Sequence, residues 1–176
     1  MHGLVTSSKL SLRVADEIAT KAIEIAIANS FKPISVCVMD PSGHAIVTKR
    51  MDDCPPIAYP KISFAKANTC VSTKSSSRAY GMKYLSGKNC EPVAPDVFAR
   101  VLNQISIMDG KMAAFQGGVL IRESGNGEVV GSIGVSGAAG DEDEYCALRA
   151  VKECSIGDSL ITEPSDHSCN TVRSHL

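Results

Sequence analysis

The sequence contains no tryptophan, and aromatic residues make up only 5% of its 176 residues. Because hydrophobic residues still reach 44%, the core must be built mainly from Ala, Val, Ile and Leu. No apolar run approaches the roughly 18 residues of a membrane span. The start, MHGLVTSSKL, also lacks the apolar stretch of a secretory signal. These absences predict a soluble intracellular protein.

An excess of either charge is also missing, since 18 basic and 19 acidic residues leave a formal net charge of −1. This balance offers no electrostatic footprint for nucleic acid or an anionic membrane, so neither is expected as a partner. The 7 cysteines are odd in number and include no CxxC pair, which disfavours a disulfide framework and a zinc knuckle. We expect reduced thiols that pack as small hydrophobes in a single domain.

Periodicity and turn residues predict pairs of strands separated by helices. The expected helices cover 11–30, 60–70, 78–85, 95–102 and the region from 141 onward, and the expected strands cover 34–39, 45–50, 115–122 and 129–135. Tight turns at Pro41–Gly43 and Gly125–Gly127 join the strands into hairpins. Strands paired by hairpins form an antiparallel sheet, so the fold class is α+β rather than doubly wound.

The first hairpin, DPSGHAIVTKRMDDCPP at residues 40–56, brings together side chains that can bind ligands. His44, Met51 and Cys54 belong to residue types that bind haem iron, and His44 and Cys54 are the candidate iron ligands. The alternative is an exposed turn whose polar side chains are simply solvated. No nucleophilic triad can be built around His44, because the sequence identifies no partner for it.

Three cations near this hairpin could receive a small acid. Arg50 suits bidentate binding of a carboxylate, and Lys61 and Lys66 could add positive charge. The alternative is that all three are solvated charges on helix and strand ends.

Two glycine-rich stretches indicate close approaches to the backbone. In QGGV, Gly117 and Gly118 could donate backbone amides to a ligand, or they could form a bulge at the start of a strand. GSIGVSG at 131–137 lacks the Gly-Lys-Ser/Thr ending of a phosphate loop. Glycines inside a strand mark close contact with a packed helix, a ligand or a partner subunit.

Four acidic residues, at 141–144, open the last helix. The helix dipole stabilises exposed acids in a first turn, which accounts for them without a function. Their spacing does not match a calcium-binding EF-hand loop.

The last three residues, Ser174, His175 and Leu176, resemble a variant of the peroxisomal address, whose standard form is S-K-L. Residues 155–173 look flexible enough to present this tripeptide to a peroxisomal import receptor. The alternative is a frayed tail. We therefore expect a cytoplasmic or peroxisomal location.

Taken together, four segments resemble the GlcG/HbpS-like family in order and spacing. They are VMDPSGHAIVTKRMDDCPP, KISFAKANTC, GGVLI and GEVVGSIGVSGAAGDEDEYCA, and the resemblance covers most of residues 10–153. It implies a profilin-like antiparallel sheet flanked by helices in residues 1–154, assembly into homo-oligomers, and haem binding as in some relatives. Residues 155–176 form an additional tail. The family's usual GGVPI is GGVLI here, so Leu120 could alter the rim of a pocket.

The resemblance also carries over individual positions of the family's motifs. They are Arg50, Met51 and Asp52 after the hairpin, Lys66, Gly117, Gly118, Ser136, Gly137, Asp143 and Glu144.

Two hypotheses follow. In the first, the protein is a homo-oligomer that binds haem or another small organic ligand near a subunit interface. In the second, it is an isomerase, hydratase or lyase acting on a small oxygenated acid or carbonyl compound. Arg50 or Lys66 would then anchor the substrate, the amides of Gly117 and Gly118 would stabilise negative charge, and Asp52 or Glu144 would move the proton.

Overall fold

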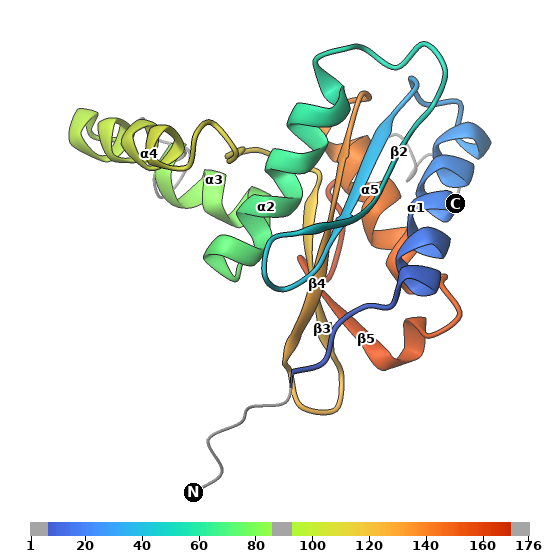
Figure 1. Ribbon diagram of the computed structural model, residues 1–176. Coiled ribbons are helices and arrows are strands. Elements are labelled where there is room, and N and C mark those ends of the chain that lie inside the picture. The colour runs from blue at the N-terminus through green and yellow to red at the C-terminus, as the bar shows by residue number, and fades with distance from the viewer. Residues whose placement is uncertain (1–6, 86–92, 170–176) are drawn as a thin grey trace, which may run out of the picture.

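The computed structural model describes residues 7–85 and 93–169 (Figure 1). Five strands form one antiparallel sheet in the order β2-β1-β4-β3-β5. The strands are β1 (Ser35–Met39), β2 (Ala45–Arg50), β3 (Gly118–Glu123), β4 (Val129–Ser136) and β5 (Leu160–Glu163). The α-helices are α1 (Leu12–Ala28), α2 (Ser63–Thr73), α3 (Ser77–Leu85), α4 (Pro95–Ile107) and α5 (Gly140–Lys152). The predicted α+β class, with an antiparallel sheet flanked by helices, is confirmed.

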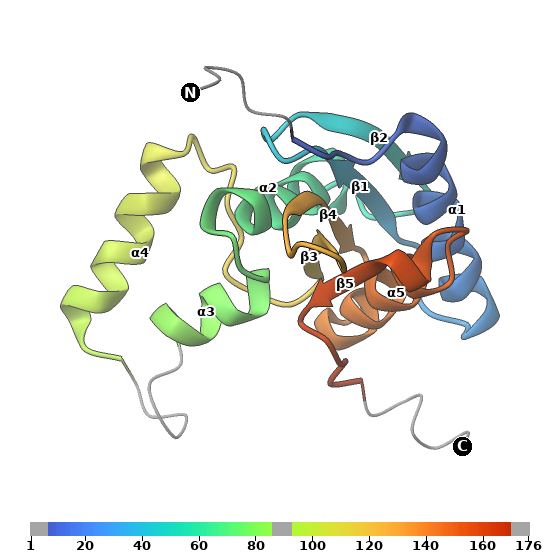
Figure 2. The same cartoon turned by 90° about the horizontal axis from the view of Figure 1, so that it is seen from below.

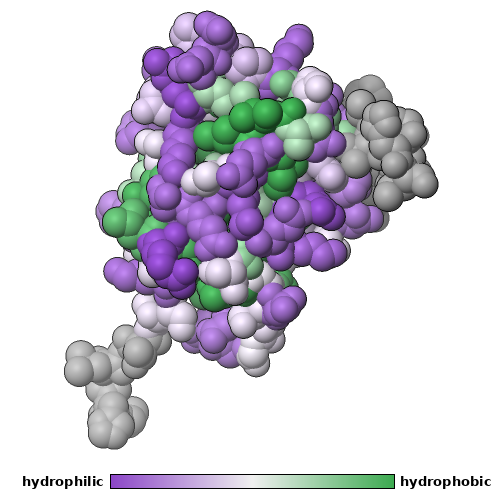
Figure 3. Space-filling view, turned by 90° about the vertical axis from the view of Figure 1, so that its right-hand side faces the viewer, coloured by the Kyte–Doolittle hydropathy of each residue, from purple (hydrophilic) through white to green (hydrophobic). Residues whose placement is uncertain are grey.

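The helices form layers on both faces of the sheet. Helices α1 and α5 pack together on one face, and α2 packs on the other, with α3 and α4 extending beyond it (Figures 1 and 2). The side chain of Ser11 accepts a hydrogen bond from the amide of Val14 at 3.4 Å and so caps α1 as expected. Polar side chains dominate the surface on the α1 side, with apolar ones gathered in a band between them (Figure 3).

Every residue of β1 is buried, because β1 lies between β2 and β4 and helices cover both of its faces. Val36 and Val38 pack into the core on the α1 side, whereas Cys37 and Met39 pack under α2. The alternation in the sequence therefore separates two buried faces. Leu120 on β3 is also fully buried under α2, so the expectation that it shapes the rim of a pocket is wrong.

The expectation of a flexible segment at 155–173 is wrong for its first part. Residues 160–163 form β5, which pairs with β3 from Leu120↔Glu163 to Glu123↔Leu160. A short strand here covers backbone groups that β3 would otherwise leave unpaired at the edge of the sheet. Ser174, His175 and Leu176 lie outside the described residues. Among the described helices, none is both long and apolar enough to cross a bilayer.

Candidate functional site

Most of the predicted site residues gather at one end of the sheet. Across neighbouring strands, Arg50 lies opposite Ser35, and Ser35 lies opposite Ser136. Gly117, at the start of β3, lies against the side chains of Lys66 and Asp143. The antiparallel register therefore joins positions that are far apart in the sequence.

Lys66 is buried at this end, with only 1% of its surface exposed. Its Nζ donates to Asp143 Oδ2 at 2.8 Å and to the carbonyl of Val135 at 2.7 Å, and it lies 5.3 Å from the centre of the Phe115 ring. Gly117 has φ +110°, and a Cβ there would lie 2.6 Å from Lys66 Nζ. The solvated interpretation of Lys66 is wrong, and an internal carboxylate and carbonyl occupy the ammonium that was predicted to anchor a substrate.

Asp143 and Glu144 are also buried, so the exposed-acid interpretation is wrong for these two. Asp143 Oδ1 accepts from the amide of Ala138 at 3.0 Å. Burial raises the pKa of Asp143 to about 6, against the opposing effect of the Lys66 charge. Burial also lowers the pKa of Lys66, although Asp143 beside it acts in the opposite direction.

Glu144 has no exposed surface, and Arg78 Nη1 lies 3.1 Å from its Oε1. Burial raises the pKa of Glu144 to about 7, and Arg78 limits this rise. Helical spacing could have indicated that these two acids are buried. Positions 143 and 144 lie three or four residues before the buried Ala147 and seven before the buried Ala150 and Val151.

The glycines serve mainly the packing of α2. A Cβ on Gly134 would overlap the backbone of Ser63, and one on Gly118 would lie 2.6 Å from the carbonyl oxygen of Lys66. The packed-helix interpretation of the 131–137 glycines is therefore confirmed at Gly134, and Gly118 makes a similar close approach to α2. The amide of Gly118 donates to Ser77 Oγ at 2.8 Å, so the prediction that it is free to stabilise a substrate is wrong.

Ser136 and Gly137 also lie at this end of the sheet. Ser136 is buried, and Gly137 has φ +142°, where a Cβ would overlap the carbonyl of Pro33. Gly137 is thus packed against neighbouring backbone.

His44 lies apart from this cluster. It occupies the tip of the first hairpin, its side chain is 82% exposed, and its amide donates to Asp40 Oδ1 at 3.0 Å. The six residues of β2 separate it from Met51 by roughly 20 Å, at about 3.3 Å per residue. The predicted grouping of His44 with Met51 and Cys54 therefore does not form within one subunit.

Met51 and Cys54 do lie at the sheet end, but both are engaged in packing. Met51 Sδ accepts from the amide of Ile34 at 3.3 Å. Cys54 is 4% exposed, and burial raises the pKa of its thiol. In residues 7–85 and 93–169, no three His, Cys, Asp or Glu side chains are placed to hold a metal ion.

Arg50 and Asp52 are exposed beside this end of the sheet. The Arg50 guanidinium lies 5.7 Å from the centre of the Tyr59 ring, a cation–π distance. Of the three predicted cations, Arg50 and Lys61 are exposed, whereas Lys66 is buried.

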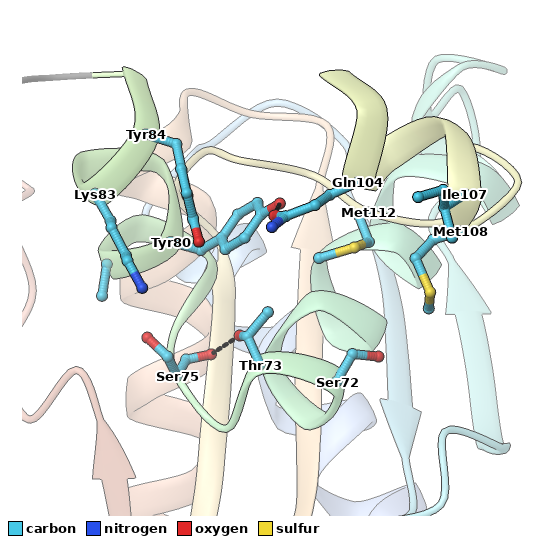
Figure 4. A pocket seen from close by; sticks show the side chains of 11 residues that line it. Ser72, Thr73, Ser75, Tyr80, Lys83, Tyr84, Gln104, Ile107, Met108 and Met112 are labelled. Carbon is cyan, nitrogen blue, oxygen red and sulfur yellow. Dashed lines mark hydrogen bonds between the residues drawn. The ribbon is translucent and has the colours of Figure 1, made fainter. Parts of the chain in front are cut away.

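A pocket of about 520 Å³, missed by sequence reasoning, lies between α2, α3 and α4 (Figure 4). We call it the helical pocket. Tyr80 and Tyr84 project into it from α3, one helical turn apart, and the hydroxyl of Tyr80 donates to Gln104 Oε1 of α4 at 2.7 Å. The remaining lining comes from Ser72, Thr73, Ser75, Ala79, Lys83, Ile107, Met108 and Met112.

Tyr80, Tyr84, Gln104 and Lys83 interact with one another at the edge of the helical pocket. Gln104 and Lys83 beside Tyr84 lower the pKa of its hydroxyl, whereas burial raises that of Tyr80. The i, i+4 spacing of the two tyrosines, and of Gln104 and Met108, is the sequence signal for this pocket.

Comparison with known proteins finds relatives that match most of the chain. The family model described as "Haem degrading protein HbpS-like" matches residues 10–152. Protein GlcG from Escherichia coli strain K12 is 30% identical over 127 residues, which are 72% of this chain and 81% of GlcG.

Two solved structures share the fold. A double mutant of HbpS from Streptomyces reticuli aligns with a TM-score of 0.66 and 29% identity, over 85% of this chain and 90% of that chain. A complex of PduOC with haem aligns with a TM-score of 0.67 and 22% identity, over 84% of this chain and 97% of that chain, a likeness of fold alone.

Proposed function

The chain belongs to the HbpS-like family, and from this membership we propose that it binds a small organic ligand, with haem as the first candidate, in the helical pocket. The observation that carries this proposal is the pocket itself. Its volume of about 520 Å³ lies within the range of about 300–1,000 Å³ typical of ligand sites. Its lining of tyrosine and methionine side chains suits a flat, largely apolar molecule.

The lining also fits the chemistry of haem. Tyr and Met are among the side chains that bind haem iron. Tyr84, at the opening of the pocket, is the candidate iron ligand, and Met108 and Met112 would contact the ring. Lys83 at the edge of the pocket would pair with an acidic substituent.

A haemin titration monitored at the Soret band tests this proposal. We expect saturable 1:1 binding that Tyr84→Phe weakens at least tenfold. Tyr145→Phe is the matched control, because Tyr145 lies on α5 outside the helical pocket, and it should leave the affinity unchanged. Non-saturating binding, or a loss in His44→Ala but not in Tyr84→Phe, would reject the assignment.

The subunit interface is proposed to lie beside this pocket, on α4. Phe98, Leu102 and Ile107 are 46%, 51% and 73% exposed, and Val101 is the one fully buried residue of the helix. Large exposed apolar patches mark interaction sites. Phe98 and Leu102, one turn apart, share a face of α4, whereas Ile107 lies about 140° around the helix from Leu102. A second copy packed on the Phe98 and Leu102 face would bring the interface to the helix that also lines the pocket through Gln104 and Ile107.

Native mass spectrometry tests the proposed interface. We expect a homo-oligomer for the parent chain and dissociation to monomers in Leu102→Asp. Leu12→Asp is the control, since Leu12 is a similarly exposed leucine on α1. A monomeric parent chain, or an equal effect of both variants, would contradict the interface.

Enzyme activity on a small oxygenated acid or carbonyl compound is the second candidate. The observation that favours it is the pair of buried acids, Asp143 and Glu144, because raised carboxyl pKa values suit proton transfer near neutral pH. Of the positions predicted for this chemistry, Arg50 and Asp52 remain exposed to a substrate. Isomerisation or hydration that survives in both Glu144→Gln and Arg50→Ala would remove these roles.

We also propose that Ser174, His175 and Leu176 are read by a peroxisomal import receptor, with a cytoplasmic location as the alternative. The support is the tripeptide alone. A fluorescent fusion that ends in Ser174, His175 and Leu176 should enter peroxisomes, and removal of these three residues should leave it in the cytoplasm. Identical distributions of the two fusions would contradict the address.

A further inference from the structure

Residues 164–169, which follow β5, lie beside α5 and the start of β3. We call them the C-terminal strap. Arg78 Nη2 donates to the carbonyl of Asp166 at 3.0 Å, and Gln116 Nε2 donates to Ser168 Oγ at 2.8 Å. Cys169 is fully buried. The strap lies beyond residues 10–152, the part that the family model matches, and side chains within that part hold it.

Glu144 is the buried group that this region shields. It has no exposed surface, and although Arg78 Nη1 lies 3.1 Å away, neither carboxylate oxygen makes a hydrogen bond. His167 on the strap stacks edge-on against Tyr145, next to Glu144 in α5, with ring centres 4.8 Å apart. Its Nδ1 is likewise buried without a hydrogen bond.

These three atoms have a common location. Within the described residues, Glu144 Oε1, Glu144 Oε2 and His167 Nδ1 are the only buried side-chain nitrogen or oxygen atoms without a hydrogen bond. An unsatisfied buried polar atom destabilises the contact that buries it. Glu144 is nevertheless paired in charge with Arg78 at 3.1 Å, and the backbone of Ser168 on the strap lowers its pKa. Among the described residues, His167 Nδ1 is therefore the buried polar atom that the closed strap leaves without any partner.

The surroundings leave room for the strap to move. A hollow of about 670 Å³ lies between α5 and β5, bordered by Leu148 and Lys152 on one side and by Asp166 and His167 on the other. β5 itself is fixed by its pairing with β3, and Glu163 Oε1 accepts from the amide of Ser76 at 3.3 Å. The point of movement would thus lie just after Glu163.

We propose that the C-terminal strap is a removable cover that closes Glu144 off from solvent and can open by rotation after Glu163. In the closed form the Asp166 carbonyl and the Ser168 hydroxyl occupy the donors of Arg78 and Gln116. In the open form both donors face solvent beside Glu144, and they suit a small molecule that carries neutral carbonyl and hydroxyl oxygens. The cover is independent of haem binding, because no strap residue lines the helical pocket.

Two measurements on the full chain test the cover together. A water-soluble carbodiimide with an amine labels exposed carboxyls, so peptide mass spectrometry reports the accessibility of Glu144. Hydrogen exchange of the amides at 165–169 reports opening of the strap. Gln116→Ala and Ser168→Ala each remove the hydrogen bond between these residues, and Gln104→Ala makes the same side-chain change in the helical pocket as the control.

We expect Glu144 labelling to rise several-fold in Gln116→Ala and in Ser168→Ala, with faster exchange at 165–169 and unchanged exchange in β5. Gln104→Ala should match the parent chain. Faster exchange without increased labelling would show that the strap opens but does not cover Glu144. No change in either measurement, or joint opening of β5, would also overturn the proposal.

Discussion

Polar side chains are buried and paired at the sheet end around Lys66, whereas they line an opening in the helical pocket. At the sheet end, Lys66, Asp143 and Gly118 are occupied by partners inside the chain. In the helical pocket, Tyr84 and Lys83 lie at an opening between helices, and α4 beside it leaves Phe98 and Leu102 exposed. The comparison shows that a cluster of functional residue types can hold a fold together, while a less conspicuous surface remains available for a ligand.

Removal of Lys66 should produce the largest effect, because it leaves Asp143 buried without its counter-charge. We expect Lys66→Met to lower the free energy of unfolding by about 3–5 kcal/mol. Lys61→Met, at an exposed lysine, should change it by less than about 0.5 kcal/mol. Urea unfolding at pH 7 measures both. Equal effects would show that the sheet end does not depend on this ion pair.

The close approach of α2 predicts the next largest effect. Gly134→Ala places a Cβ against the backbone of Ser63, which should lower the free energy of unfolding by about 1–3 kcal/mol. Gly125→Ala is the matched control, because no atom lies within 4 Å of its added Cβ. Thermal unfolding of the two variants compares them directly. A stable Gly134→Ala would mean that α2 can move away from β4.

The buried acid Glu144 predicts a smaller, pH-dependent effect. Its pKa is raised from 4.5 to about 7, so the folded chain binds more protons than the unfolded chain in this window. Stability should therefore fall as pH rises, by about 1 kcal/mol between pH 6 and 8 from this residue. Arg78, Lys66 and Asp141 are the charged groups that act on it.

Urea unfolding at pH 6 and 8 checks this sign. Glu144→Gln should remove about that much of the decrease, whereas Glu128→Gln, at an exposed glutamate, should leave it unchanged. A parent chain whose stability depends on pH in the same way as Glu144→Gln would contradict the raised pKa.

The smallest effect is expected at His44, which the sequence analysis named as a candidate iron ligand. Its exposed side chain touches only the hairpin tip, so His44→Ala should change the free energy of unfolding by less than about 0.5 kcal/mol. Haemin affinity should remain that of the parent chain. A tenfold loss of affinity would return the iron site to the hairpin.

The local patterns of the sequence were sufficient for the order of elements and the α+β class, because hairpin turns and helical spacing act over a few residues. They could not show that Gly117 gives Lys66 access to Asp143, since this contact spans 77 residues. The helical pocket was missed for a related reason. Tyr80 and Gln104 meet only because α3 and α4 pack side by side. Likewise, nothing local in the tail predicted that Leu160–Glu163 would pair with β3.

Hydrogen exchange of the full chain with and without haemin tests most directly where the ligand binds. We expect slower exchange in residues 77–84 and 95–112, which border the helical pocket, and unchanged exchange at 50–54 and 117–118. Slower exchange confined to the sheet end, or no change in either region at saturating haemin, would contradict it.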